Sequence, residues 1–125
     1  MKHFSLGRTM TKQFKVNKTE MECLANILLQ IDSESIYISK NKGISGLANI
    51  KEYQKIKNLA YNLIGRQNLM YIEKYQQTVF FCYKSRLMTG IGIAYTSNGK
   101  NPKSRSGDMI SVKKIENNWF YCELD

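Results

Sequence analysis

The chain has little acid, proline or histidine, and it has no long apolar run. Its 125 residues include one proline, one histidine and ten Asp and Glu against 19 Lys and Arg, which gives a net charge of +9. A membrane-spanning helix needs about 20 mostly apolar residues in a row, and the N-terminal stretch lacks the apolar centre of a secretory signal. We therefore expect a cytoplasmic protein that folds as a single domain over residues 1–125.

Metal and catalytic motifs are also missing. The three cysteines, Cys23, Cys82 and Cys122, are odd in number and widely separated, whereas zinc sites use closely paired ligands. The only histidine, His3, has no clustered acids beside it, and no nucleophile motif or phosphate-binding glycine loop occurs. We expect buried free thiols, no metal, no cofactor and no catalytic residue. The sequence leaves enzymatic activity open without supporting it; a small ribonuclease that works without a metal is the form to consider.

Two stretches have the apolar periodicity of helices, residues 17–31 and 50–65. The repeating positions are Met21, Leu24, Leu28 and Ile31 in the first stretch and Tyr53, Ile56, Ala60 and Leu63 in the second. Asn17 or Thr19 is expected to cap the first helix, with an acid three residues later. Residues 1–16 carry bases and no acid, and they are expected to form a basic arm or an edge strand.

Alternating apolar residues predict strands in the rest of the chain. A short strand is expected at 35–39, and 40–46 reads as a turn. A hairpin is expected over 69–84, whose second strand is apolar on both faces and therefore central in a sheet. The remaining expected strands lie at 87–95, 109–115 and 118–124, with a loop at 97–108. Gly90 and Gly92 predict a bulge or a close backbone approach.

The predicted fold is α+β, with two main helices packed on an antiparallel sheet of about five strands. Residues 17–84 follow the order helix, strand, helix, hairpin, and the C-terminal antiparallel strands occupy 85–125. This order is that of a winged helix, in which the second long helix enters the major groove of DNA.

The charge pattern favours an anionic partner. Residues 1–18 and 40–66 are basic, while 19–39 carry acids alone, and such segregation favours nucleic acid or an acidic protein. One face of the second helix combines lysine, arginine and amide side chains, which bind phosphates and base edges. The predicted nucleic-acid-binding residues are Lys51, Lys55, Asn58, Asn62, Arg66, Lys74, Lys12, Lys15, Lys100, Lys103 and Arg105. DNA is expected rather than RNA, without a membrane partner, and the oligomeric state is not predicted.

A protein- or ligand-binding module is the alternative. Helices on one face of a curved antiparallel sheet also describe a cystatin-like or NTF2-like layout. A mobile-element inhibitor that blocks an acidic or nucleic-acid-handling partner belongs to this class. An exposed aromatic cluster around Tyr95, Trp119 and Tyr121 would favour it.

Overall fold

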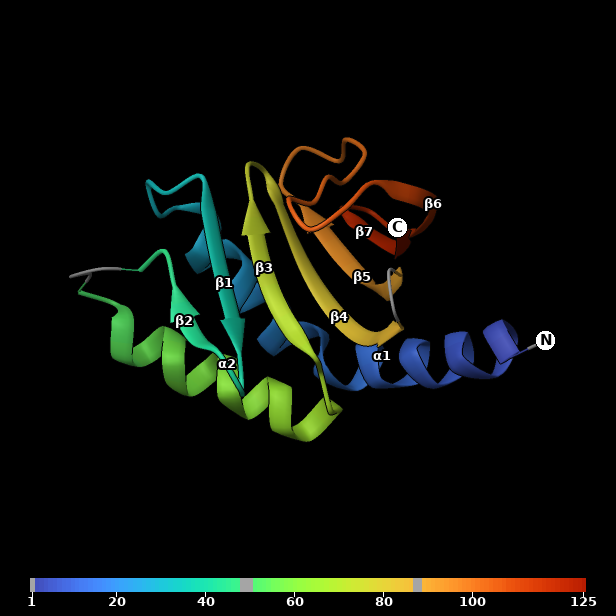
Figure 1. Ribbon diagram of the computed structural model, residues 1–125, viewed down its shortest axis with the longest axis horizontal. Coiled ribbons are helices and arrows are strands. Elements are labelled where there is room, and N and C mark those ends of the chain that lie inside the picture. Colours follow the sequence, from blue (N-terminus) through green and yellow to red (C-terminus); the bar gives the residue numbers. More distant parts are fainter. Residues whose placement is uncertain (1, 48–50, 87–88) are drawn as a thin grey trace.

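The computed structural model describes residues 2–47, 51–86 and 89–125, and it is α+β as predicted (Figure 1). Its elements are α1 (Lys2–Leu29), β1 (Ser35–Ser39), β2 (Gly43–Ser45), α2 (Tyr53–Gln67), β3 (Tyr71–Tyr75), β4 (Thr78–Arg86), β5 (Thr89–Thr96), β6 (Met109–Glu116) and β7 (Trp119–Leu124). The strands pair in the order β2-β1-β3-β4-β5-β7-β6, and every pairing is antiparallel. Over the described residues the sheet thus has seven strands, where about five were expected. The unexpected β2 lies in the segment that was expected to be a turn.

Helix α1 is much longer than its apolar pattern suggested. The prediction that residues 1–16 form a basic arm or an edge strand is wrong, because the helix begins at Lys2. Met10 and Phe14 are almost fully buried and continue the apolar stripe toward the N-terminus at helical spacing. Asn17 hides that continuity, because it occupies the next position of the same stripe. Its side-chain amide donates to the carbonyl of Gln13, 2.9 Å away, so Asn17 lies inside the helix and does not cap it.

The main core fills the space between the two helices and one face of the sheet. Trp119 lies at the centre of this core and is 1% exposed. Its ring centroid is 4.8 Å from those of Phe14 and Tyr95 and 6.1 Å from that of Phe81. Strand β7 thereby packs against α1, more than 100 residues earlier in the chain. Burial of Tyr95 and Trp119 also means that they do not form the exposed aromatic cluster expected of a ligand-binding module.

The hairpin β3–β4 lies in the middle of the sheet, with β1 on one side and β5 on the other (Figure 1). A central position for β4 was predicted and is confirmed. It also means that the hairpin does not protrude as a wing would, so the winged-helix layout is not confirmed. The second face of β4 packs in a smaller core around Phe80, Cys82, Phe120 and Leu124.

Gly92 lies where the backbone of β5 approaches β4 closely. A side chain at this position would collide with the carbonyl oxygen of Phe81 and would lie 2.9 Å from ring carbons of Phe80. The pairing register shifts between Cys82 and Lys84, directly opposite. Both features that the glycine pattern predicted, a bulge and a close approach, are therefore present.

Two of the three cysteines are buried, and this should make the fold sensitive to alkali. Cys82 and Cys122 lie in the smaller core, whereas Cys23 is exposed on α1, contrary to the prediction of three buried thiols. Burial raises the pKa of Cys82 from 9.0 to about 11 and the pKa of Cys122 from 9.0 to about 12. As the pH rises above 9, the unfolded chain loses these protons before the folded chain does.

We expect each buried thiol to cost about 1.4 kcal/mol of unfolding free energy by about pH 10. The loss begins near the ordinary thiol pKa of 9.0 and continues up to the raised folded-state values. Urea unfolding at about pH 7 and about pH 10 measures it. A Cys82→Ala/Cys122→Ala variant should lose about 3 kcal/mol less between these pH values than wild type. An equal loss in both proteins would show that the thiols do not carry the effect.

Candidate nucleic-acid interface

The predicted basic stripe of α2 divides into two parts in the structure. Lys51 precedes the helix, and Lys55 and Asn58 lie on its outer surface, where all three are exposed. Asn58 accepts a hydrogen bond from the side chain of Gln54 at 3.0 Å. The ammonium groups of Lys51 and Lys55 form no ion pair within the described residues. This end of the stripe is open to an anionic ligand.

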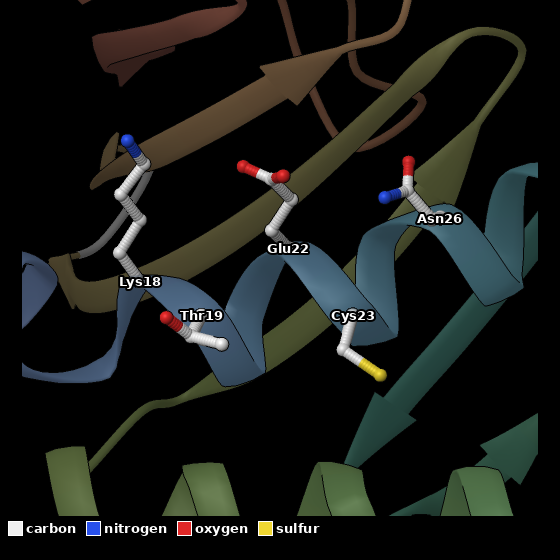
Figure 2. A pocket seen from close by; sticks show the side chains of 5 residues that line it. All are labelled: Lys18, Thr19, Glu22, Cys23 and Asn26. Atoms are coloured by element: carbon white, nitrogen blue, oxygen red, sulfur yellow. The ribbon is translucent and has the colours of Figure 1, made fainter.

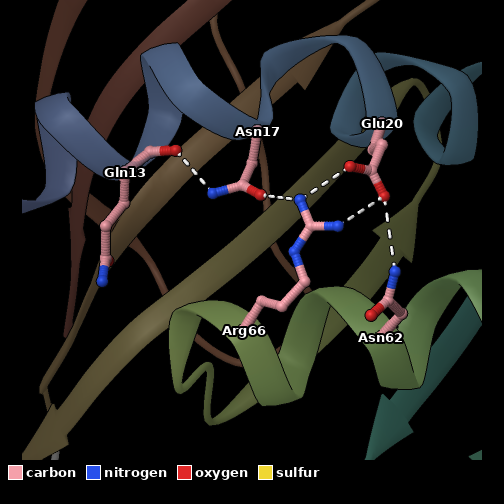
Figure 3. A network of polar contacts seen from close by, with 5 residues as sticks. All are labelled: Gln13, Asn17, Glu20, Asn62 and Arg66. Carbon is pink, nitrogen blue, oxygen red and sulfur yellow. Dashed lines mark hydrogen bonds and ion pairs between the residues drawn. The ribbon is translucent and has the colours of Figure 1, made fainter.

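The other end of the stripe, Asn62 and Arg66, turns toward α1 (Figure 3). Arg66 forms a two-pronged ion pair with Glu20, with nitrogen–oxygen distances of 2.6 and 3.1 Å. It also donates to the side chain of Asn17, and Asn62 reaches Glu20 at 3.4 Å. These contacts hold the two helices together, so both side chains already have partners within the protein.

Lys74 was predicted to touch phosphate near the tip of the β3–β4 hairpin, but its side chain is buried. Its ammonium group donates to the carbonyl of Ser33 and, at 3.3 Å, to the carbonyl of Ile31, just after the end of α1. Desolvation lowers the pKa of Lys74, although the nearby charges of Asp32 and Glu34 act in the opposite direction. The lysine therefore bonds backbone carbonyls of the segment between α1 and β1, and its ammonium group already has partners within the protein.

The remaining predicted cations lie at the surface on two elements. Lys12 and Lys15 are exposed on the N-terminal half of α1, which extends past the end of α2 (Figure 1). Lys100, Lys103 and Arg105 are exposed on the loop between β5 and β6, residues 97–108, which we call the strap.

The strap is fixed to the sheet by a buried carboxylate. Glu73 of β3 is 3% exposed and accepts hydrogen bonds from the hydroxyls of Ser104 and Ser106, both at 2.6 Å, and from the backbone amide of Arg105 at 3.3 Å. The backbone amide of Lys103 donates to the hydroxyl of Thr78 on β4 at 3.0 Å. Residues 103–106 therefore lie across β3 and β4, on the sheet face opposite the helices.

Beside the strap, this second face of the sheet carries a stacked pair of tyrosines. Tyr37 of β1 and Tyr71 of β3 have ring centroids 5.0 Å apart and planes inclined by 25°. Phe80 lies behind Tyr71, with ring centroids 6.1 Å apart. Both tyrosines are partly exposed. We call the part of this face around Tyr37 and Tyr71 the open face, because both helices pack on the opposite side.

Glu73 and Tyr37 were not among the predicted site residues. The alternation of β3 does place Tyr71, Glu73 and Tyr75 on one face, which was the available signal. The side chains that contact this face come from distant parts of the chain. Tyr37 lies 34 residues before Tyr71, and Ser104 lies 31 residues after Glu73.

A groove of about 400 Å³ runs along α1 and is lined by Lys18, Thr19, Glu22, Cys23 and Asn26 (Figure 2). Its charged groups already have partners, because Lys18 pairs with Glu116 and Glu22 accepts from the indole of Trp119 at 3.5 Å. In the part of the chain that the structure describes, no group of three His, Cys, Asp or Glu side chains is placed to hold a metal ion. The groove therefore offers neither a cationic nor a metal-binding centre.

Comparison with protein-family models, curated proteins and solved structures finds no match to this chain. Among the described helices, none has enough length and apolar character to cross a membrane. Functional inference therefore depends on the arrangement of this chain's own side chains.

Proposed function

We propose that this protein binds nucleic acid through its surface cations. The observation that supports the proposal is the excess of exposed cations over exposed acids among the described residues. Of the ten acids, Glu20, Glu73 and Glu116 bond internal partners, while the exposed acids also include Asp32, Glu34, Glu52, Asp108 and Asp125. The exposed cations for which the described residues provide no ion pair are the predicted Lys12, Lys15, Lys51, Lys55, Lys100, Lys103 and Arg105, and in addition Lys40, Lys42, Lys113 and Lys114. A net charge of +9 is thus presented mainly outward, where it attracts a polyanion.

The proposal does not need the wing of a winged helix. Surface lysines contact phosphates without reading sequence, and such contacts set position and affinity. The predicted cations lie on α1, at the start of α2 and on the strap, and the others lie in the turn between β1 and β2 and on β6, which gives a ligand several points of contact. Contacts of this kind are common to DNA and RNA, and DNA is our first choice of ligand.

A salt titration tests the proposal. We expect labelled mixed-sequence oligonucleotides to bind at about 50 mM salt, with log K falling linearly against log salt by about 0.7–0.9 per phosphate contact. Fluorescence anisotropy measures both quantities. The Lys12→Ala/Lys15→Ala and Lys51→Ala/Lys55→Ala variants should each bind more weakly with a shallower salt slope. No binding at low salt would contradict the proposal and would direct attention to an acidic protein.

Lys18 provides a charge-matched control. Lys55→Ala and Lys18→Ala each remove one positive charge, but Lys18 pairs with Glu116 while Lys55 has no such partner among the described residues. If binding depends on located phosphate contacts, Lys55→Ala should weaken it more than Lys18→Ala. Equal losses would mean that only net charge matters, and the assignment of these residues to an interface would be wrong.

A further inference from the structure

We propose that the open face of the sheet binds a single-stranded nucleic acid by stacking a base on the ring of Tyr37. This inference rests on the proposed function and adds to it the form of the ligand and the place where it binds. The basic stripe of α2 does not lie on this face; of the predicted site residues, only Lys103 and Arg105 of the strap are on the same side of the described sheet.

Tyr37 is supported on one side and open on the other. Its ring stacks on Tyr71 at 5.0 Å, and Phe80 backs Tyr71, so the rings form a row that continues into the smaller core. On the opposite side, β2 places Ser45 directly across from Tyr37. Ser45 is exposed, and its side chain is too small to cover an aromatic ring. A base can therefore extend the row of rings from the side of β2.

Cations lie at two positions around this ring. Lys40 and Lys42, in the turn between β1 and β2, are exposed and follow Tyr37 by three and five residues. The strap contributes Lys103 and Arg105 on the same sheet face. Asp32 and Glu34, which precede β1, lie close enough to Lys74 to interact with its charge, so their own charge is partly offset. The surroundings of Tyr37 thus suit a phosphate backbone.

Glu73 holds the strap beside Tyr37. It lies directly opposite Tyr37 in the register of β1 and β3. Its oxygens accept from Ser104, Ser106 and the backbone amide of Arg105. These bonds hold the backbone of the strap, and the side chain of Arg105 is exposed.

The geometry favours a single strand over a duplex. Base faces are covered in a duplex, whereas an unpaired base presents a face that stacks on an aromatic side chain. The open face presents ring surface, and both helices of the described residues, which alone could enter a groove, pack on the other side of the sheet. Stacking accepts any base, so we expect little sequence preference.

The test compares wild type on three ligands of equal length: a single strand, the same strand with abasic sites in place of bases, and the duplex. All three carry phosphates, but the abasic strand cannot stack. We expect the affinity for the single strand to be at least about tenfold higher than the affinity for the abasic strand. The test requires no substitution, so misfolding cannot confuse it. Equal binding of the two strands would overturn the inference and leave the proposed function standing, whereas binding of none would overturn both.

Substitutions then place the contact. Tyr37→Ala should weaken single-strand binding about tenfold, and Tyr37→Phe, which keeps the ring, should bind like wild type. Tyr53→Ala is the matched control, because Tyr53 is an exposed tyrosine on α2. Tyr37→Leu keeps a large side chain but removes the aromatic face, so it should also bind the single strand about tenfold more weakly than wild type. It serves as the test if the alanine variant folds poorly. Wild-type affinity in a folded Tyr37→Leu variant would overturn the assignment to Tyr37.

Discussion

Replacing Trp119 by alanine is expected to lower the free energy of unfolding by about 3–5 kcal/mol. The side chain is 1% exposed, and its ring packs against Phe14 of α1, Phe81 of β4 and Tyr95 of β5. Its removal leaves a cavity where the helix, the centre of the sheet and β7 meet. Urea unfolding followed by circular dichroism measures the loss.

Two controls separate this effect from general sensitivity to substitution. Trp119→Phe retains an aromatic ring and should cost clearly less than the alanine variant. Val16→Ala, on the exposed surface of α1 where the side chain is 74% exposed, should change stability by less than about 0.5 kcal/mol. A Trp119→Ala variant as stable as wild type would show that α1 does not pack on β7 in this way.

Replacing Glu73 by alanine should release the strap and destabilise the fold by about 2–4 kcal/mol. The substitution removes the acceptor for two serine hydroxyls and one backbone amide beneath the loop. Lys103 and Arg105 are trypsin sites in the segment that these bonds hold. We therefore expect limited trypsin digestion to cut the variant after these residues at least about tenfold faster than wild type, since cleavage follows local opening.

Glu73→Gln and Glu116→Ala are the controls for the strap. Glutamine keeps one acceptor oxygen and should give an intermediate cutting rate. Glu116 is an exposed glutamate that pairs with Lys18, and its removal should leave the strap as resistant as in wild type. Equal digestion rates for Glu73→Ala and wild type would mean that the carboxylate does not hold the loop.

The strand predictions were reliable for β4, which is apolar on both faces, and for β5, which has glycines along one face. The apolar run of β4 predicted a central strand, and the glycines of β5 predicted the close approach that the Phe80 ring makes over Gly92. Helix α1 was predicted only in its second half, because the polar Asn17 interrupts the apolar stripe. Its amide is satisfied within the helix and by Arg66, which no local pattern reveals.

The partners of charged residues could not be predicted from the sequence. Arg66 fits a basic surface stripe until Glu20, 46 residues earlier, is placed beside it. Lys74 and Glu73 are neighbours in β3, yet both are buried, because a strand directs consecutive side chains to opposite faces. Lys74 bonds the carbonyl of Ser33, 41 residues earlier and just after α1. Glu73 bonds Ser104 of the strap, 31 residues later. The charged side chains of Arg66, Lys74 and Glu73 thus bond groups within the protein, which the sequence alone does not indicate.

Amide chemical shifts recorded during titration with a single-stranded oligonucleotide give the most direct test of nucleic-acid binding at the open face. We expect the largest changes in β1, β3 and residues 103–106, with smaller changes at the exposed lysines of α1 and α2. Changes confined to the two helices would contradict binding at Tyr37 while supporting nucleic-acid binding elsewhere. A spectrum that does not change at low salt would contradict both.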